Sequence, residues 1–104
     1  MLRKENRATT AQVRETIRTG VSKHSKNFSM RVRTSPHPIP KVNVVISKKV
    51  ASTAVLRNLL KRRIKNILRS VELPAHKHTV IYAKKDVPQL TPTEIKEELQ
   101  VLLR

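Results

Sequence analysis

The sequence predicts a single α/β (α+β) domain over residues 1–104. Two observations support this fold class. At 104 residues, the chain has the length of one domain and can bury one modest core. Three segments repeat apolar residues with helical spacing and three others with the pattern of strands, in the order α-β-β-α-β-α. This periodicity disfavours a disordered basic tail, which the composition alone would also allow.

The first predicted element is a helix over residues 10–19. Either of the threonines at its start can cap it, and Gly20 ends it. Val13 and Ile17 are four residues apart and are expected to face one way.

Two strands are predicted next, separated by a loop with three prolines over residues 34–40. In the first strand Phe28, Met30 and Val32 alternate with Ser29, Arg31 and Arg33, which predicts a half-buried strand. The second contains Val42, Val44, Val45 and Ile46. This run is apolar enough to predict a central strand of the sheet.

A long helix is predicted over residues 51–71, with Ser52 or Thr53 as its cap. When the residues are projected around the helix axis, apolar residues fall on one arc and basic residues on the opposite arc. Arg63 lies at the edge of the apolar arc. Leu68 falls on the basic side without an explanation. The apolar arc contains Leu56, Leu59, Leu60, Ile64, Ile67 and Val71, and the basic arc Arg57, Asn58, Lys61, Arg62, Lys65 and Arg69.

A third strand and a last helix complete the predicted order. The strand covers residues 79–83 and ends at Lys84-Lys85. The helix starts with Thr91 as cap, Pro92 at its first position and Glu94 in a capping box. Its apolar stripe is formed by Ile95, Leu99, Leu102 and Leu103.

The distribution of charge indicates a polyanionic partner. The net charge is +16, and no acidic residue occurs between Glu15 and Glu72. The same stretch holds fourteen of the 23 lysines and arginines. A surface with so many unneutralised cations repels itself unless a polyanion covers it, so RNA or DNA is the first hypothesis.

The composition disfavours several other classes of protein. One glycine cannot build a glycine-rich phosphate loop, and the absence of cysteine excludes a thiolate metal site. The acids are too scattered for a Mg²⁺ cage supplied by the protein, and His76 with His78 is more typical of an exposed turn than of a metal pair. Phe28 and Tyr82 are too few aromatics for an RNA-binding module that stacks bases.

Targeting signals are not evident either. The first residues have no apolar segment behind them that would indicate a signal peptide, and no apolar run approaches 18 residues. We therefore expect a cytoplasmic protein. A basic helix lying on an anionic membrane is the less favoured alternative, because strands surround the helix in sequence.

These residues resemble the bacterial ribonuclease P protein component. Residues 45–50 read VISKKV and residues 54–62 read AVLRNLLKR. The run typical of that family is a strand, then S-K-K-V-G, then A-V-x-R-N-R-x-K-R-x-x-R. The resemblance extends to the opening L-x-x-x-N-R at residues 2–7, to Gly20, to residues 81–85 and to the last helix.

The resemblance implies that residues 1–104 form a single RNA-binding domain with the fold of a two-layer α/β (α+β) sandwich. It also implies a left-handed β-α-β crossover, whereas the general rule for such units favours a right-handed one. It also implies that the catalytic subunit is a large RNA, whose bound Mg²⁺ ions hydrolyse the phosphodiester and release the 5′ leader of precursor tRNA. The protein then binds ribonuclease P RNA through the long helix and holds the leader in a cleft between the sheet and the first helix. No catalytic residue, membrane or small-molecule substrate is expected for the protein.

Matched residue by residue, the resemblance assigns two groups of side chains. The RNA-binding group comprises Lys48, Lys49, Arg57, Asn58, Lys61, Arg62, Lys65 and Arg69. The leader-binding group comprises Val13, Ile17, Phe28, Arg31, Arg33, Lys84 and Lys85. Arginine forks suit bidentate phosphate contacts, whereas lysine acts as a point charge.

Five positions depart from the family pattern. Leu59 replaces the second arginine of R-N-R, which removes one RNA contact or moves it to Arg63. Asn43 and Ala51 stand where glycine is usual, and Val13 and Ile17 replace aromatics of the first helix. We therefore expect leader contacts that are aliphatic and weaker than in the family.

Three alternatives remain at this point. A ribosomal or other structural RNA-binding protein would use the same basic helix without a processing role. A DNA-binding protein would use it as a recognition helix, although a strand rather than a helix precedes it. A metal-dependent nuclease acting without RNA is disfavoured by the scattered acids.

Overall fold

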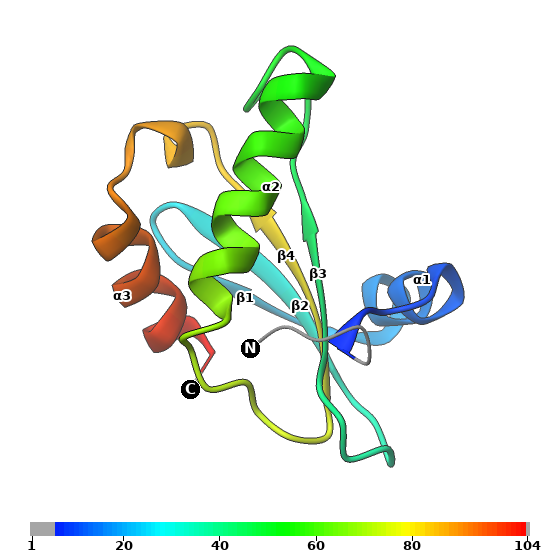
Figure 1. Cartoon of the computed structure of the whole chain (residues 1–104). Helices are drawn as coiled ribbons and strands as arrows, with labels where there is room; N and C mark the ends of the chain where they lie inside the picture. Colours follow the sequence, from blue (N-terminus) through cyan, green and yellow to red (C-terminus); the bar gives the residue numbers. More distant parts are fainter. Residues whose placement is uncertain (1–5, 104) are drawn as a thin grey trace.

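A computed structural model describes residues 6–103 and consists of a four-stranded mixed sheet with helices on both faces. The sheet has the order β1-β2-β4-β3, in which β1–β2 and β2–β4 are antiparallel and β3–β4 is parallel (Figure 1). The strands are β1 (Val21–His24), β2 (Phe28–Thr34), β3 (Lys41–Val45) and β4 (Lys77–Ala83). The helices are α1 (Thr10–Thr19), α2 (Ala54–Leu68), the short 3-10 helix η2 (Val87–Gln89) and α3 (Pro92–Leu102). This arrangement confirms the predicted fold class.

The alternation of side chains along β2 divides the sheet into two faces. Phe28, Met30 and Val32 point to the face covered by α2 and α3, together with Ile81 of β4 opposite Met30. This face holds the hydrophobic core. Its buried members from the helices are Leu60, Ile64 and Leu68 of α2 and Ile95, Leu99 and Leu102 of α3.

The sequence analysis missed β1 and placed β3 wrongly. β1 has one apolar residue, Val21, and all four of its residues are exposed, so it carries no apolar alternation and is held by pairing with β2. β3 is an edge strand, not the predicted central one. Its apolar residues are explained by the contacts that cover the strand. Val42 and Val44 are buried on the core face, and Arg7 forms a β-bridge with Val42 along the edge of the sheet.

Helix α2 is shorter than predicted and is rotated relative to the predicted arc. Thr53 caps it by accepting a hydrogen bond from the backbone N–H of Leu56 at 3.2 Å. Leu68, which the projection left unexplained, is 1% exposed and belongs to the core. Leu56 and Leu59, predicted to face the core, are 50% and 53% exposed. The sheet and α3 fix this rotation, which the apolar pattern of the helix alone does not specify.

The β3-α2-β4 connection is left-handed, as the family resemblance implies. In Figure 1 both strands point upward, α2 lies in front of the sheet, and the chain passes from β3 to β4 on its left. A crossover of the common hand would place β4 on the right. In the sheet, β4 lies between β3 and β2, and its Val80 and Ile81 are both buried.

Helix α3 begins as predicted and carries the carboxylate that fixes the β1–β2 turn. Thr91 and Glu94 form the capping box, with Pro92 in the first turn. Glu98, one turn further, accepts hydrogen bonds from the side chain of Ser25 and from the backbone N–H and side-chain amide of Asn27, the last two at 2.8 Å. This contact joins the hairpin to the last helix across the sheet edge.

The Glu98 contact predicts a loss of stability in acid. Burial raises the pKa of Glu98, but the hydrogen bonds from Ser25, Asn27 and the Phe28 backbone together lower it below its ordinary 4.5. A carboxyl whose pKa is lowered by folding contributes stability that is complete above pH 4.5 and is lost as the pH falls through the folded-state value. Glu98→Gln should lower the free energy of unfolding at pH 7 by about 1–3 kcal/mol and by less in acid.

Urea denaturation at pH 7 and below pH 4.5 measures this difference. Glu97→Gln on the exposed neighbouring position is the matched control and should leave the pH dependence unchanged. An equal effect of Glu98→Gln at both pH values would show that the carboxylate charge has no part in the contact.

Helix α1 packs on the opposite face of the sheet, where it contacts β2 and β4. Its bounds and its cap, Thr9, agree with the prediction. Thr16, rather than the predicted apolar pair, is its most buried residue at 1% exposure. Gly20 follows the helix directly against β2: a Cβ there would overlap the carbonyl oxygen of Thr16 and lie 3.1 Å from that of Val32. Only glycine allows this close approach.

Candidate nucleic-acid interface

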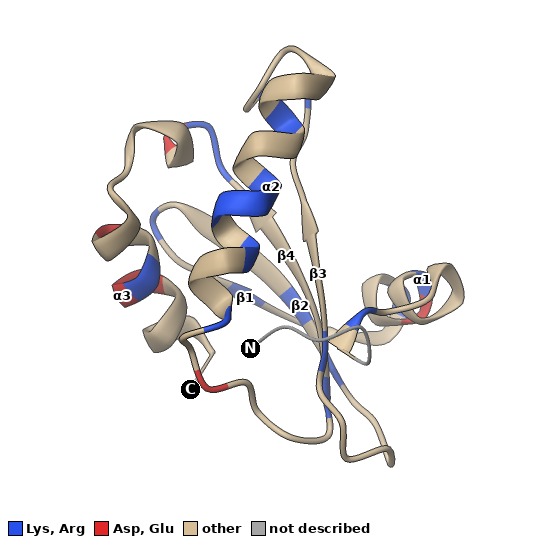
Figure 2. Cartoon of the chain, in the orientation of Figure 1, with Lys and Arg blue, Asp and Glu red and all other residues tan. Residues whose placement is uncertain are grey.

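Helix α2 carries lysines and arginines along its length (Figure 2). Helix α2 contains no acidic residue, so no carboxylate pairs with a cation along it. Asn58, Arg62 and Lys65 are exposed along the helix, Arg69 is exposed at its end, and Lys48 and Lys49 are exposed in the turn after β3. We call these six residues the α2 basic face.

Arg57 differs from its predicted position on the open basic side. Its side chain is half-buried at the start of α2, and Nη1 donates to the carbonyl oxygens of Ala51 at 3.0 Å and Ser52 at 3.2 Å. Lys61, one turn later, is also half-buried. The guanidinium of Arg57 therefore fixes the loop that enters the helix. The helical projection could not show this, because the partners are backbone carbonyls outside the helix.

The acidic residues that the structure describes lie outside α2 and outside the turn that contains Lys48 and Lys49. Figure 2 shows acidic positions on α1, on α3 and in the loops before and after β4. Glu15 on α1 forms an ion pair with Arg18 at 2.7 Å, which lowers the pKa of Glu15 and raises that of Arg18. The charge of the domain is therefore divided between a cationic helix α2 and a mixed surface elsewhere.

A second group of cations lies between α1 and the sheet. The Arg31 guanidinium donates to the carbonyl oxygen of Ile17 from Nε at 3.1 Å and from Nη2 at 2.5 Å. Its Nη1 donates to the hydroxyl of Ser22 at 2.5 Å. Arg31 therefore joins the last turn of α1 to β1. Of the two predicted apolar residues, Val13 is half-buried and Ile17 is 39% exposed.

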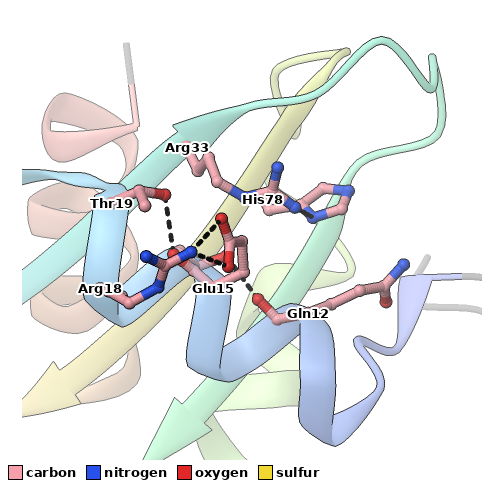
Figure 3. Close-up of polar contacts among 7 residues, drawn as sticks. Gln12, Glu15, Arg18, Thr19, Arg33 and His78 are labelled. Carbon is pink, nitrogen blue, oxygen red and sulfur yellow. Dashed lines mark hydrogen bonds and ion pairs between the residues drawn. The ribbon is translucent and has the colours of Figure 1, made fainter.

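Arg33 and His78 form a cross-strand pair beside this region (Figure 3). Arg33 Nη2 lies 3.0 Å from His78 Nδ1, and because a guanidinium only donates, Nδ1 accepts and the ring proton is on Nε2. Burial and the charges of Arg33, Lys41 and His37 lower the pKa of His78, so the ring is neutral. Among residues 6–103, Arg33 Nε and His78 Nε2 have no hydrogen-bond partner. Two buried donors are thus left for an acceptor.

The sequence analysis missed His78 as a site residue. It treated the H-x-H spacing as an exposed turn, whereas His78 is 3% exposed and His76 alone lies in the turn, with a positive φ of 63°. The signal that could have identified His78 is strand pairing, since the β2–β4 register places it opposite Arg33. Register is set by long-range pairing, which one sequence does not reveal.

The remaining predicted leader residues divide between surface and core. Lys84 and Lys85 are exposed after β4, and Lys84 Nζ donates to the carbonyl oxygen of Ser25 at 2.6 Å. Phe28 was assigned to the leader cleft, and that assignment is wrong. Its ring is 0% exposed and lies on the core face with α2 and α3, on the side of the sheet away from α1.

Neither a cluster of metal ligands nor a membrane-spanning helix occurs among residues 6–103. In the part of the chain that the structure describes, no three His, Asp or Glu side chains come together as metal ligands. No helix within residues 6–103 has both the length and the apolar character needed to cross a membrane.

Comparison with known proteins links this geometry to one family. The family model for ribonuclease P matches residues 1–104. The ribonuclease P protein component of Thermus oshimai is 37% identical over 73 residues, covering 70% of this chain and 47% of the relative. That of Thermus scotoductus is 36% identical over 70 residues, covering 67% and 42%. The chain thus spans less than half the length of these curated relatives.

Solved structures share the fold. The RNase P protein of Thermotoga maritima aligns with a TM-score of 0.82 at 21% identity, covering 93% of this chain and 94% of that one. The RNase P protein of Staphylococcus aureus aligns with a TM-score of 0.74 at 23% identity, covering 92% and 89%. The four-stranded mixed sheet with three α-helices is therefore the architecture of these proteins.

Proposed function

The chain belongs to the bacterial ribonuclease P protein family, and we propose that it serves as the protein subunit of ribonuclease P. In this role it binds ribonuclease P RNA and promotes endonucleolytic removal of the 5′ leader from precursor tRNA. The RNA subunit carries the chemistry. The protein contributes binding and positioning.

The α2 basic face is the observation that carries this proposal. Six exposed residues from one helix and the turn before it form a surface without a neutralising carboxylate on the helix. Cations arranged in this way bind a phosphate backbone and release its counterions. Within the family, the partner that such a surface fits is the catalytic RNA.

The proposed division of roles between RNA and protein also assigns the Mg²⁺ ions to the RNA subunit. Mg²⁺ supplies the Lewis acid for phosphodiester hydrolysis when it is bound, mainly by the RNA subunit. The described part of this chain gathers no set of three metal ligands. Its own contribution is to neutralise phosphates, which lowers the Mg²⁺ concentration that the RNA requires.

The test is reconstitution with the ribonuclease P RNA of the same genome. Adding the protein should lower the Mg²⁺ requirement for cleavage of precursor tRNA. The logarithm of RNA affinity should fall with that of salt concentration at a slope of about −4 to −7 for six to eight neutralised phosphates. An unchanged Mg²⁺ requirement, or co-purification with ribosomal RNA, would favour the structural RNA-binding alternative.

The region between α1 and the sheet is the proposed site for the 5′ leader. Arg31 and Arg33 supply charge from β2, and Val13 and Ile17 an aliphatic wall from α1. Lys84 and Lys85 follow the end of β4 opposite to His78, beside the β1–β2 turn and away from α1 (Figure 2), so they would contact the leader only beyond this region. Two buried nitrogen atoms without a hydrogen-bond partner among residues 6–103, Arg33 Nε and His78 Nε2, support this proposal. Phosphate oxygens or base carbonyls of the leader can accept hydrogen bonds from them.

Substitution of Arg33 tests the leader site. Arg33→Ala should weaken binding of leader-bearing precursor tRNA to the holoenzyme by about 1–3 kcal/mol, because one charged hydrogen-bond donor is lost. Binding of mature tRNA, which has no leader, should be unchanged. Equilibrium binding of both tRNAs measures the difference.

Lys77→Ala is the matched control for Arg33→Ala. Lys77 precedes His78 on β4, and its ammonium donates to the hydroxyl of Thr34 at 2.9 Å. Alternation along the strand places it on the opposite face of the sheet from His78. It removes one charge and should affect neither tRNA. Equal losses for precursor and mature tRNA in Arg33→Ala would exclude a leader-specific role.

A further inference from the structure

A groove with an apolar floor and a cationic rim lies between α2 and the start of α3. It has a volume of about 650 Å³. Leu59 and Ile67 from α2 and Pro92 from α3 form its apolar part, and Arg62, Arg63 and Lys96 form its rim. The six residues are called the α2–α3 groove below.

The apolar floor is unusual on an otherwise cationic helix. Leu59 is 53% exposed, although α2 buries Leu60, Ile64 and Leu68 in the core. Leu59 therefore has no partner that removes it from water, and it stands where the resembled motif has arginine. An exposed leucine alone needs no explanation, but one enclosed by three cations indicates a ligand with both apolar and anionic parts.

The charge of the groove selects the chemistry of that ligand. No acidic residue is among the lining residues, whereas three cations are. Arg62 belongs to both the groove and the α2 basic face, so a phosphate backbone lying on that face reaches the groove directly. A nucleotide that is unpaired can place its base on Leu59 and Ile67 while its phosphates contact the rim.

We propose that the α2–α3 groove binds an unpaired nucleotide of ribonuclease P RNA, with the base on Leu59 and Ile67 and the flanking phosphates on Arg62, Arg63 and Lys96. This inference rests on the proposed function. In this arrangement Leu59 contacts a base, whereas the arginine of the family motif at this position would contact a phosphate.

Salt-dependent binding of the RNA subunit separates the two kinds of contact. Leu59→Ala should weaken binding about fivefold at every salt concentration, because part of a leucine side chain loses its burial, and the salt slope should not change. Arg63→Ala and Lys96→Ala should each reduce the magnitude of the slope by about 0.7–0.9. Val55→Ala, on the same helix, 69% exposed and outside the groove, is the matched control and should have no effect.

Cross-linking identifies the ligand directly. The chain has no cysteine, so Leu59→Cys and Val55→Cys each introduce a single attachment point for a photoreactive aryl azide. With the reconstituted holoenzyme, the probe at position 59 should cross-link to an unpaired nucleotide. The probe at position 55 should not cross-link to that nucleotide.

The outcomes distinguish failure of this inference from failure of the proposed function. If Leu59→Ala binds as tightly as the unmodified protein, or the cross-link falls in a base-paired helix, the groove does not hold an unpaired nucleotide, while RNA binding by the α2 basic face stands. A cross-link to a protein in place of RNA would also overturn the inference. If the unmodified protein does not bind the RNA subunit at all, the proposed function itself fails.

Discussion

Reversing two charges on α2 should abolish assembly with ribonuclease P RNA. Arg62→Glu combined with Lys65→Glu removes two phosphate contacts and adds repulsion, which should weaken binding by about 3–6 kcal/mol in total. Both side chains are exposed, so the fold should persist. Filter binding or fluorescence titration with the RNA subunit measures the loss, and circular dichroism checks the fold.

The control for charge reversal must change the net charge equally at another surface. Arg14→Glu combined with Lys26→Glu does so from α1 and from the turn between β1 and β2, where both residues are exposed. This control should reduce RNA affinity far less, and only through the long-range field. Equal losses for the two double variants would show that net charge, rather than the α2 basic face, governs binding.

Phe28→Ala should be the most destabilising single substitution considered. The ring is 0% exposed in the core, and removing it should lower the free energy of unfolding by about 3–5 kcal/mol through lost burial and the remaining cavity. For a domain of this size, that is a large fraction of the expected total stability. Urea denaturation monitored by circular dichroism gives the value.

A milder substitution tests the corrected role of Phe28. Phe28→Leu keeps an apolar side chain in the core and should lower stability by less, while precursor tRNA binds as tightly as before. Loss of leader-dependent affinity in a folded Phe28→Leu protein would return the residue to the leader site and contradict its position on the core face.

Local signals predicted the parts of the fold that depend on neighbours in sequence. The caps at Thr53 and Thr91 and the end of α1 at Gly20 all occur as expected, because a cap is decided within four residues. The alternation from Phe28 to Arg33 also predicted both faces of β2. By contrast, β1 has no apolar pattern, since pairing with β2 rather than burial holds it.

The sequence predicted which residues of α2 carry the positive charge, but it did not predict their contacts or the rotation of the helix. The cations of α2 were identified from the sequence, yet Arg57 is directed to the carbonyls of Ala51 and Ser52, outside its own helix. Leu59 and Leu68 exchanged their expected environments because α3 and the sheet set the rotation of α2. The pairing of Arg33 with His78 depends on a register that only the assembled sheet supplies.

The single glycine of the chain has a consequence for how this protein can diverge. At Gly20, main chain meets main chain, so the clearance between α1 and β2 is set by backbone atoms and offers no side chain to lengthen or shorten. Substitutions at Val13, Ile17 or Arg31 would change the side chains of the proposed leader site, but they would leave the backbone spacing at Gly20 unchanged. If the proposed leader site is correct, we expect leader preference in related chains that keep this glycine to change through the chemistry of these side chains, because the approach of α1 to β2 beside Gly20 is fixed by backbone atoms.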